Sequence, residues 1–139
     1  QQSAGGHRQH ELERQLHLMD LFVQAKVRLL TDRINAKFQF ARFQLFRTLV
    51  NGGVEECCET TYNGVPYQSL NHGARLNVGL DIINTLAQHY GFAPPVWIDN
   101  AESVTDILPT RGQQIRLVVS AGDRTLRVVT HEPAVKEAV

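Results

Sequence analysis

The feature that most constrains this chain is a long run of apolar or small residues at helical spacing near its beginning. They recur in steps of three, four and four, with no proline or glycine between them: Leu16, Met19, Val23, Val27, Leu30, Ile34, Phe38, Ala41, Leu45 and Leu49. Such an eleven-residue period favours a nearly straight or slightly right-handed coiled coil. We therefore predict one coiled-coil helix over residues 10–50, about 60 Å long, whose partner helix is not in this sequence.

The two ends of this helix are predicted from local signals. Residues 1–9 show no periodicity and are expected to form a disordered leader. Aromatic residues widen the stripe near its end, at Phe40, Phe43 and Phe46, which predicts that the helix enters a globular core there. The sequence Asn51-Gly52-Gly53 is expected to end it, because glycine readily adopts the left-handed conformation that closes helices.

After residue 50 the pattern changes to short elements separated by turns. An Asn63-Gly64 pair between two β-prone runs predicts a hairpin, and Gly91 predicts the end of a second helix. The expected elements are a hairpin over 54–62 and 65–67, a helix over 76–90, and strands over 96–98, 115–120 and 126–130. The chain is therefore expected to be an α/β protein with an arm at 10–50, a lobe at 51–130 and a tail at 131–139.

Composition fits a single domain in a reducing compartment. The 139 residues are 42% hydrophobic, and 14 basic residues balance 14 acidic ones, so net charge identifies no nucleic-acid or membrane partner. The two cysteines, Cys57 and Cys58, are adjacent, and neighbours on a strand point to opposite faces, so no disulfide framework is expected. No apolar run reaches the length of a membrane span. A cytoplasmic protein without a membrane partner is expected.

Two segments carry the candidate chemistry. Residues 95–99 form an apolar run that ends in Asp99, and an aspartate at the carboxyl end of a central strand holds magnesium in phosphate-handling ATPases. The alternative is an ordinary strand followed by a turn aspartate. Residues 69–75 form a small polar loop containing Gly73 directly before the second predicted helix.

The order of hairpin, glycine-containing loop, helix, apolar strand, aspartate and further strand resembles the carboxy-terminal head lobe of an ABC-class coiled-coil ATPase. It is similar to the structural-maintenance-of-chromosomes type, in the DNA repair and recombination branch of bacteria and their phages, over about residues 10–130. The resemblance implies that the full-length protein binds ATP and Mg²⁺, pairs with a second head as a homodimer and acts on DNA. It also implies an amino-terminal ATPase lobe of the same protein, which would carry the phosphate loop.

No Gly-Lys pair occurs in the chain, so the phosphate loop of that class is missing from it. The isolated chain is therefore expected to bind no ATP and to be inactive. The family's signature loop falls on residues 70–74, which makes Asn71, His72 and Gly73 the expected nucleotide contacts. Only Leu70 and Gly73 match the family pattern, and the alternative role of Asn71 is a helix N-cap.

The family's Walker B strand places Asp99 at the magnesium ion. Asn100 then stands where the family has a catalytic glutamate, and an amide can orient water but cannot take its proton. Glu102 is the alternative catalytic residue, two positions further on. Ser103 and Asp106 match the two ends of the family's D-loop, at the interface between two heads around the nucleotide.

Two readings follow from the departures at Asn71, Asn100 and Ser120, the last of which stands where the family has a switch histidine. In the first, the chain is part of a working ATPase. In the second, hydrolysis has been lost and the chain is a coiled-coil dimerisation scaffold. Four arginines near the end are a candidate DNA-binding patch, with an ordinary charged surface as the alternative: Arg111, Arg116, Arg124 and Arg127. Trp97 is expected in the core.

Overall fold

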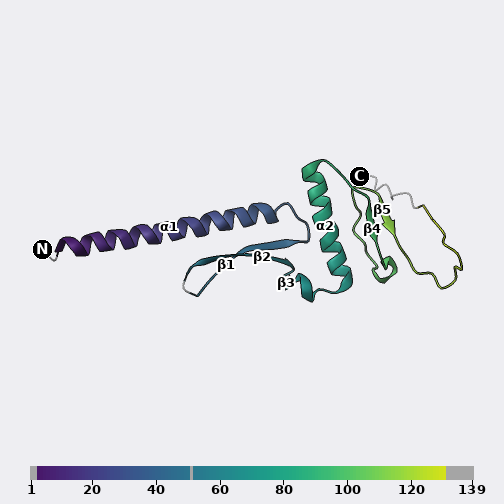
Figure 1. The fold of residues 1–139 in the computed structure, drawn as a ribbon, viewed down its shortest axis with the longest axis horizontal. Helices are drawn as coiled ribbons and strands as arrows, with labels where there is room; N and C mark the ends of the chain where they lie inside the picture. The colour runs from purple at the N-terminus through teal and green to yellow at the C-terminus, as the bar shows by residue number, and fades with distance from the viewer. Residues whose placement is uncertain (1–2, 51, 131–139) are drawn as a thin grey trace, which may run out of the picture.

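The computed structural model describes residues 3–50 and 52–130, with only the backbone described for residues 3–7. The fold is mixed α/β. It has two helices, an antiparallel sheet in the order β1-β2-β3 and a parallel sheet of β4 and β5. Helix α2 lies between the two sheets, and helix α1 extends away from them as an arm (Figure 1). The tail predicted at 131–139 lies outside the described residues.

Helix α1 spans Ser3–Asn35, so the prediction of one helix over 10–50 was wrong at both ends. It begins inside the predicted leader and ends at Asn35, fifteen residues before the predicted end at residue 50. Residues Arg42–Thr48 form strand β1 instead. The apolar and polar residues of this stretch also alternate at a period of two, and pairing with β2 supplies neighbours that a lone helix lacks.

The arm carries exposed apolar residues along most of its length. They include five members of the predicted stripe or its continuation, Leu12, Leu16, Met19, Val23 and Leu30. Contacts with the rest of the fold begin near Gln24, whose Nε2 donates to the Gly52 carbonyl at 3.3 Å. Its coiled-coil partner stays a prediction. No helix among residues 3–50 and 52–130 is long and apolar enough to cross a membrane.

The predicted hairpin is confirmed. Strand β2 spans Val54–Tyr62 and pairs antiparallel with β1 and with the short β3, Val65–Pro66. Asn63 and Gly64 form the turn between β2 and β3 with φ values of 49° and 78°, which these two residue types tolerate best. Both cysteines of β2 are free.

Helix α2 spans His72–Tyr90, four residues longer at its start than predicted, and ends at Gly91 with φ 67° as expected. It is preceded by the 3-10 turn η1, Tyr67–Ser69. Strands β4, Val96–Ile98, and β5, Gln114–Arg116, pair in parallel, with the 3-10 turn η2, Ala101–Ser103, after β4. Leu80 of α2 packs against Ile98 and Ala101 to form the main buried core.

Glycine is required where the chain approaches β5. A Cβ at Gly112 would collide with the Pro94 carbonyl oxygen, so only glycine lets this segment lie beside the start of β4. Strand β5 overlaps the strand predicted at 115–120 only at residues 115 and 116, and the strand predicted at 126–130 does not form.

Trp97 is 66% exposed, so its predicted place in the core was wrong. Residues Val96 and Ile98 face α2, and the side chain between them points to the opposite face of the sheet. Nothing in the described part of the chain covers that face of Trp97. Parallel sheets are normally covered on both faces, so this sheet presents one unoccupied side.

Candidate functional site

The start of α2 is capped by the residue assigned to the signature loop. Asn71 Oδ1 accepts a hydrogen bond from the Ala74 backbone N–H at 2.8 Å, which confirms the N-cap role. His72 is the first helical residue and is exposed. The remaining N–H groups at this helix end, together with the helix dipole, suit an anion. A nucleotide contact by Asn71, His72 or Gly73 stays a prediction.

The loop after β4 is held by a compact set of hydrogen bonds. Asp99 Oδ1 accepts from the Asn100 N–H at 2.9 Å. The Asn100 Nδ2 donates to Ser103 Oγ at 3.1 Å, and that hydroxyl donates to the Asn100 carbonyl at 2.8 Å. The Ala101 N–H donates to the Leu117 carbonyl at 3.0 Å, which fixes the loop to the segment after β5.

Asn100 has φ 54°, in the left-handed region that favours asparagine and glycine. This conformation gives a structural reason for asparagine at a position where the resemblance implies glutamate. Its amide is engaged with Ser103, so orienting water would require that contact to change. Its catalytic role stays a prediction.

We expect Asn100→Ala to lower the free energy of unfolding by about 1 kcal/mol, because alanine is strained in the left-handed conformation and cannot make the hydrogen bond to Ser103. Asn100→Gly should change it by less, since glycine adopts this φ without strain. Urea unfolding of both variants measures the difference. Equal losses in the two variants would contradict a conformational role for Asn100.

The exposed Asp99 carboxylate is the candidate magnesium ligand. Within the residues the structure describes, no group of three or more histidine, cysteine, aspartate or glutamate side chains could hold a metal ion. Magnesium in nucleotide sites is bound by one or two carboxylates together with phosphates and water, so a single exposed aspartate fits that donor set. Glu102 lies exposed on η2, and no hydrogen bond fixes its side chain in the part of the chain described.

The structure brings the two candidate segments together. A Cβ added at Gly73 would stand 3.5 Å from Val104 Cγ1, so the start of α2 lies close to the loop after β4. Residues Ser103 and Asp106 flank Val104 in sequence. The signature-like loop and the loop of residues 99–106 therefore lie close together at this point, although they are far apart in the chain.

Sequence reasoning missed the polar side chains of α2 that position the loops. Asn77, Asp81 and Asn84 recur at steps of four and three and so lie on one helix face. Asn77 and Asn84 each bond two backbone groups of residues 106–111, and Asp81 accepts from three backbone N–H groups of residues 39–41. Three polar residues at helical spacing among the apolar residues of α2 were the available signal.

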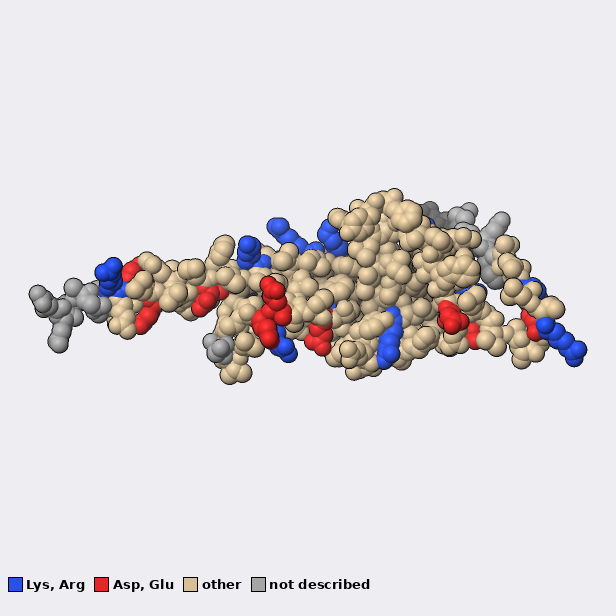
Figure 2. Space-filling model, viewed as in Figure 1, with Lys and Arg blue, Asp and Glu red and all other residues tan. Residues whose placement is uncertain are grey.

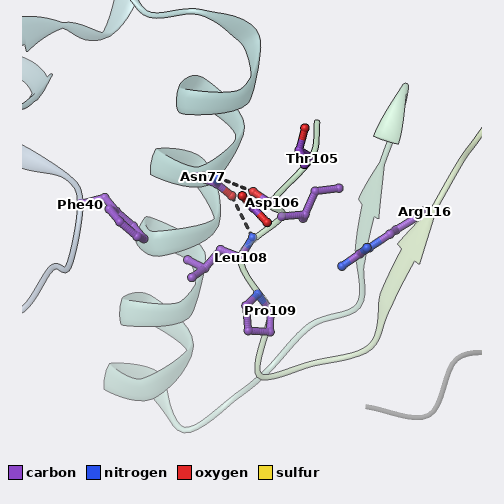
Figure 3. Close-up of a pocket in the computed structure, with 8 residues that line it drawn as sticks. Phe40, Asn77, Thr105, Asp106, Leu108, Pro109 and Arg116 are labelled. Atoms are coloured by element: carbon purple, nitrogen blue, oxygen red, sulfur yellow. Dashed lines mark hydrogen bonds between the residues drawn. The ribbon is translucent and has the colours of Figure 1, made fainter. Parts of the chain in front are cut away.

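A shallow cavity of about 390 Å³ lies between α2 and the loop of residues 105–109 (Figure 3). Phe40 and Asn77 line one side, and Arg116 of β5 lies across from them. The Arg116 guanidinium donates to Gln114 Oε1 at 2.7 and 2.9 Å. The cavity therefore combines apolar side chains with polar ones, and both an acid, Asp106, and a base, Arg116, line it.

The four arginines proposed as a DNA patch have different surroundings. Arg127 forms an ion pair with Asp123 at 3.3 Å, and Arg116 lines the cavity beside α2. Figure 2 shows basic and acidic side chains interspersed at that end of the visible face. DNA binding by these arginines stays a prediction.

Comparison with known proteins found no matching family model, no matching curated protein and no matching solved structure.

Proposed function

We propose that this chain is the carboxy-terminal head lobe of a cytoplasmic coiled-coil ATPase that acts on DNA. It would bind ATP and Mg²⁺ only together with an amino-terminal lobe, and two such heads would enclose the nucleotides. The observation that carries the proposal is the proximity of the start of α2 to the loop after Asp99, where Gly73 lies near Val104. These are the two segments that the sequence assigns to nucleotide and magnesium contacts.

The free edge of the parallel sheet supports the proposal that an amino-terminal lobe binds this chain. The Gln113 carbonyl accepts from the Val96 N–H at 2.8 Å, and the Leu117 N–H donates to the Ile98 carbonyl at 2.8 Å. Because backbone groups alternate sides along a strand, those of Gln114 and Arg116 point away from β4. A further strand from the amino-terminal lobe would pair there, and its helices would cover Trp97.

The arm supports the coiled-coil part of the proposal. A helix of 33 residues with exposed apolar side chains is stable when a second helix covers them. In the proposed protein the second helix would be the other arm of the same head.

In the assembled head each residue of this chain would have a limited role. The Asp99 carboxylate would hold Mg²⁺, which supplies charge neutralisation to the phosphates. The N–H groups at the start of α2 would bind phosphate oxygens of the nucleotide on the opposite head. Ser103 and Asp106 would line the interface between the heads, and Glu102 or Asn100 would orient water.

We expect the coding sequence upstream of this chain to encode a phosphate loop, and a head reassembled from both lobes to hydrolyse ATP. Calorimetry at millimolar ATP and Mg²⁺ should give a saturable isotherm with the reassembled head and none with this chain alone. Saturable binding to the isolated chain would contradict the proposal that ATP binding needs the amino-terminal lobe. No binding by the reassembled head would overturn the proposed function.

The second candidate is a coiled-coil scaffold that has lost hydrolysis. One observation favours it, because the Asn100 amide is tied to Ser103 and stands where an acid is needed. Head dimerisation by ATP without any turnover would support the scaffold. Measurable turnover would exclude it.

A further inference from the structure

Asn77 makes two hydrogen bonds to the backbone of one loop. Its Nδ2 donates to the Asp106 carbonyl at 2.8 Å, and its Oδ1 accepts from the Leu108 N–H at 2.8 Å (Figure 3). The side chain thus pairs with the loop as a neighbouring strand would. Both of its hydrogen-bonding groups are used, and the residue is partly buried.

Asn77 lies on α2 between two parts of the candidate site. It is less than two helical turns from Asn71 at the start of α2. Its loop partners follow Ser103 and Val104, and Val104 lies near the helix at Gly73. The loop of residues 103–108 is therefore fixed to α2 by the paired amide of Asn77, and it also passes close to the helix at Gly73.

We propose that Asn77 is a positioning residue that makes the start of α2 and the loop of residues 103–108 move as one body. For its effect on ATP turnover this inference rests on the proposed function. When two heads close on nucleotide, contacts from residues 71–73 and from Ser103 and Asp106 would then form together. Misplacement of either segment by about 1 Å can lower a rate on the order of a hundredfold.

The chain supplies a matched control two helical turns further along. Asn84 Nδ2 donates to the Pro109 carbonyl at 2.9 Å, and its Oδ1 accepts from the Arg111 N–H at 3.0 Å. The two asparagines make the same kind of contact, but Asn84 holds the loop beyond Asp106. A general loss of loop order would follow from either substitution, whereas a positioning effect would follow only from Asn77.

The test is Asn77→Asp beside Asn84→Asp. Aspartate keeps the size and the acceptor but replaces the donor with an oxygen that repels the Asp106 or Pro109 carbonyl. Amide hydrogen exchange on this chain should be about tenfold faster or more at Leu108 in Asn77→Asp, with α2 amides still protected. In Asn84→Asp the faster exchange should be confined to the region of Arg111.

In the reassembled head, Asn77→Asp should lower ATP turnover about tenfold or more with KM for ATP within about twofold. Asn84→Asp should stay within about twofold of wild type in both values. If α2 loses protection in Asn77→Asp, Asn77→Ala, which adds no charge, replaces it in both measurements.

Unchanged exchange at Leu108 would overturn the inference, and so would equal losses of turnover in the two variants. Faster exchange without a loss of turnover would also overturn it while leaving the proposed function intact. A wild-type head without turnover would instead count against the proposed function. The exchange measurement would still decide whether Asn77 fixes residues 103–108 to α2.

Discussion

Asp81→Ala is expected to lower the free energy of unfolding by roughly 3 kcal/mol or more, the largest stability loss of any single substitution discussed for this chain. The Asp81 side chain is 4% exposed and makes no ion pair with any residue that the structure describes. Its carboxylate accepts three backbone hydrogen bonds instead, from Gln39 at 3.1 Å, Phe40 at 2.7 Å and Ala41 at 2.9 Å.

The size of the effect follows from what the substitution leaves behind. Hydrogen bonds to a charged group contribute about 1.5–3 kcal/mol each, and a buried N–H without a partner costs a similar amount. Water can reach part of the loop after truncation, so the three costs do not add fully. Domains of this size are stable by about 5–15 kcal/mol, so the loss is a substantial fraction of the whole.

Two further variants separate the carboxylate from the surrounding packing. Asp81→Asn keeps one acceptor oxygen and should lose about 1–2 kcal/mol, because one oxygen can still serve Phe40 and Ala41. Thr85→Val removes only a long contact of 3.4 Å to the Lys37 carbonyl at the same joint and should lose less than about 1 kcal/mol. Urea unfolding of all three gives the order. An Asp81→Ala loss no larger than that of Thr85→Val would contradict the assignment.

Asp81 also explains why the arm stops where it does. Three backbone N–H groups at residues 39–41 point at one carboxylate on α2, so this segment cannot continue as a helix. Asn35 reinforces the break, because its amide pairs with both backbone groups of Phe43 at 2.7 and 2.9 Å. Asp81 lies outside the stripe, and Asn35 and Phe43 are eight residues apart, which is more than the spacing of neighbours on a helix. The stripe of residues 16–49 could not reveal these contacts, and it predicted a helix through β1.

The turns and the end of α2 were predictable because they depend only on residues next to each other in the chain. Asn63-Gly64 and Gly91 act through their own backbone preferences, and the structure confirms both. The N-cap at Asn71 was open between two roles, and its contact with Ala74 is equally local. Trp97 was placed wrongly because burial depends on what covers a strand, and its side chain is largely exposed among the described residues.

The candidate site shows the same division. Asp99 and the loop after it were proposed as a site because they follow a short apolar run, a signal contained within a few residues, and the structure confirms only the strand. The proximity of Gly73 to Val104 and the paired amides of Asn77 and Asn84 depend on how α2 crosses that loop. Asn100 shows both kinds of information. The sequence suggested that asparagine replaces a catalytic acid there, and the φ of 54° gives a conformational reason for asparagine at this position.

Asp99→Ala in the reassembled head should lower magnesium-dependent ATP turnover about a hundredfold or more. The proposed role of this carboxylate is to anchor the ion that neutralises charge on the transferred phosphoryl group, and such electrostatic stabilisation contributes several kcal/mol to the transition state. The side chain is exposed and its described hydrogen bond is to the next residue in the chain. Its removal should therefore leave the fold intact, with urea unfolding close to wild type.

Glu102→Gln is the comparison variant, because Glu102 is a second exposed acid on the same loop, three residues after Asp99. If Asn100 marks the position that faces water, Glu102→Gln should be nearly silent. If Glu102 has taken over as general base, it should slow turnover at saturating ATP on the order of a hundredfold while ATP binding persists. Asp99→Ala differs from both cases, because its turnover should recover in part at high Mg²⁺ concentration if the lost anchor weakens the ion. Wild-type turnover in Asp99→Ala at ordinary Mg²⁺ would show that the aspartate after β4 ends a strand and does nothing more.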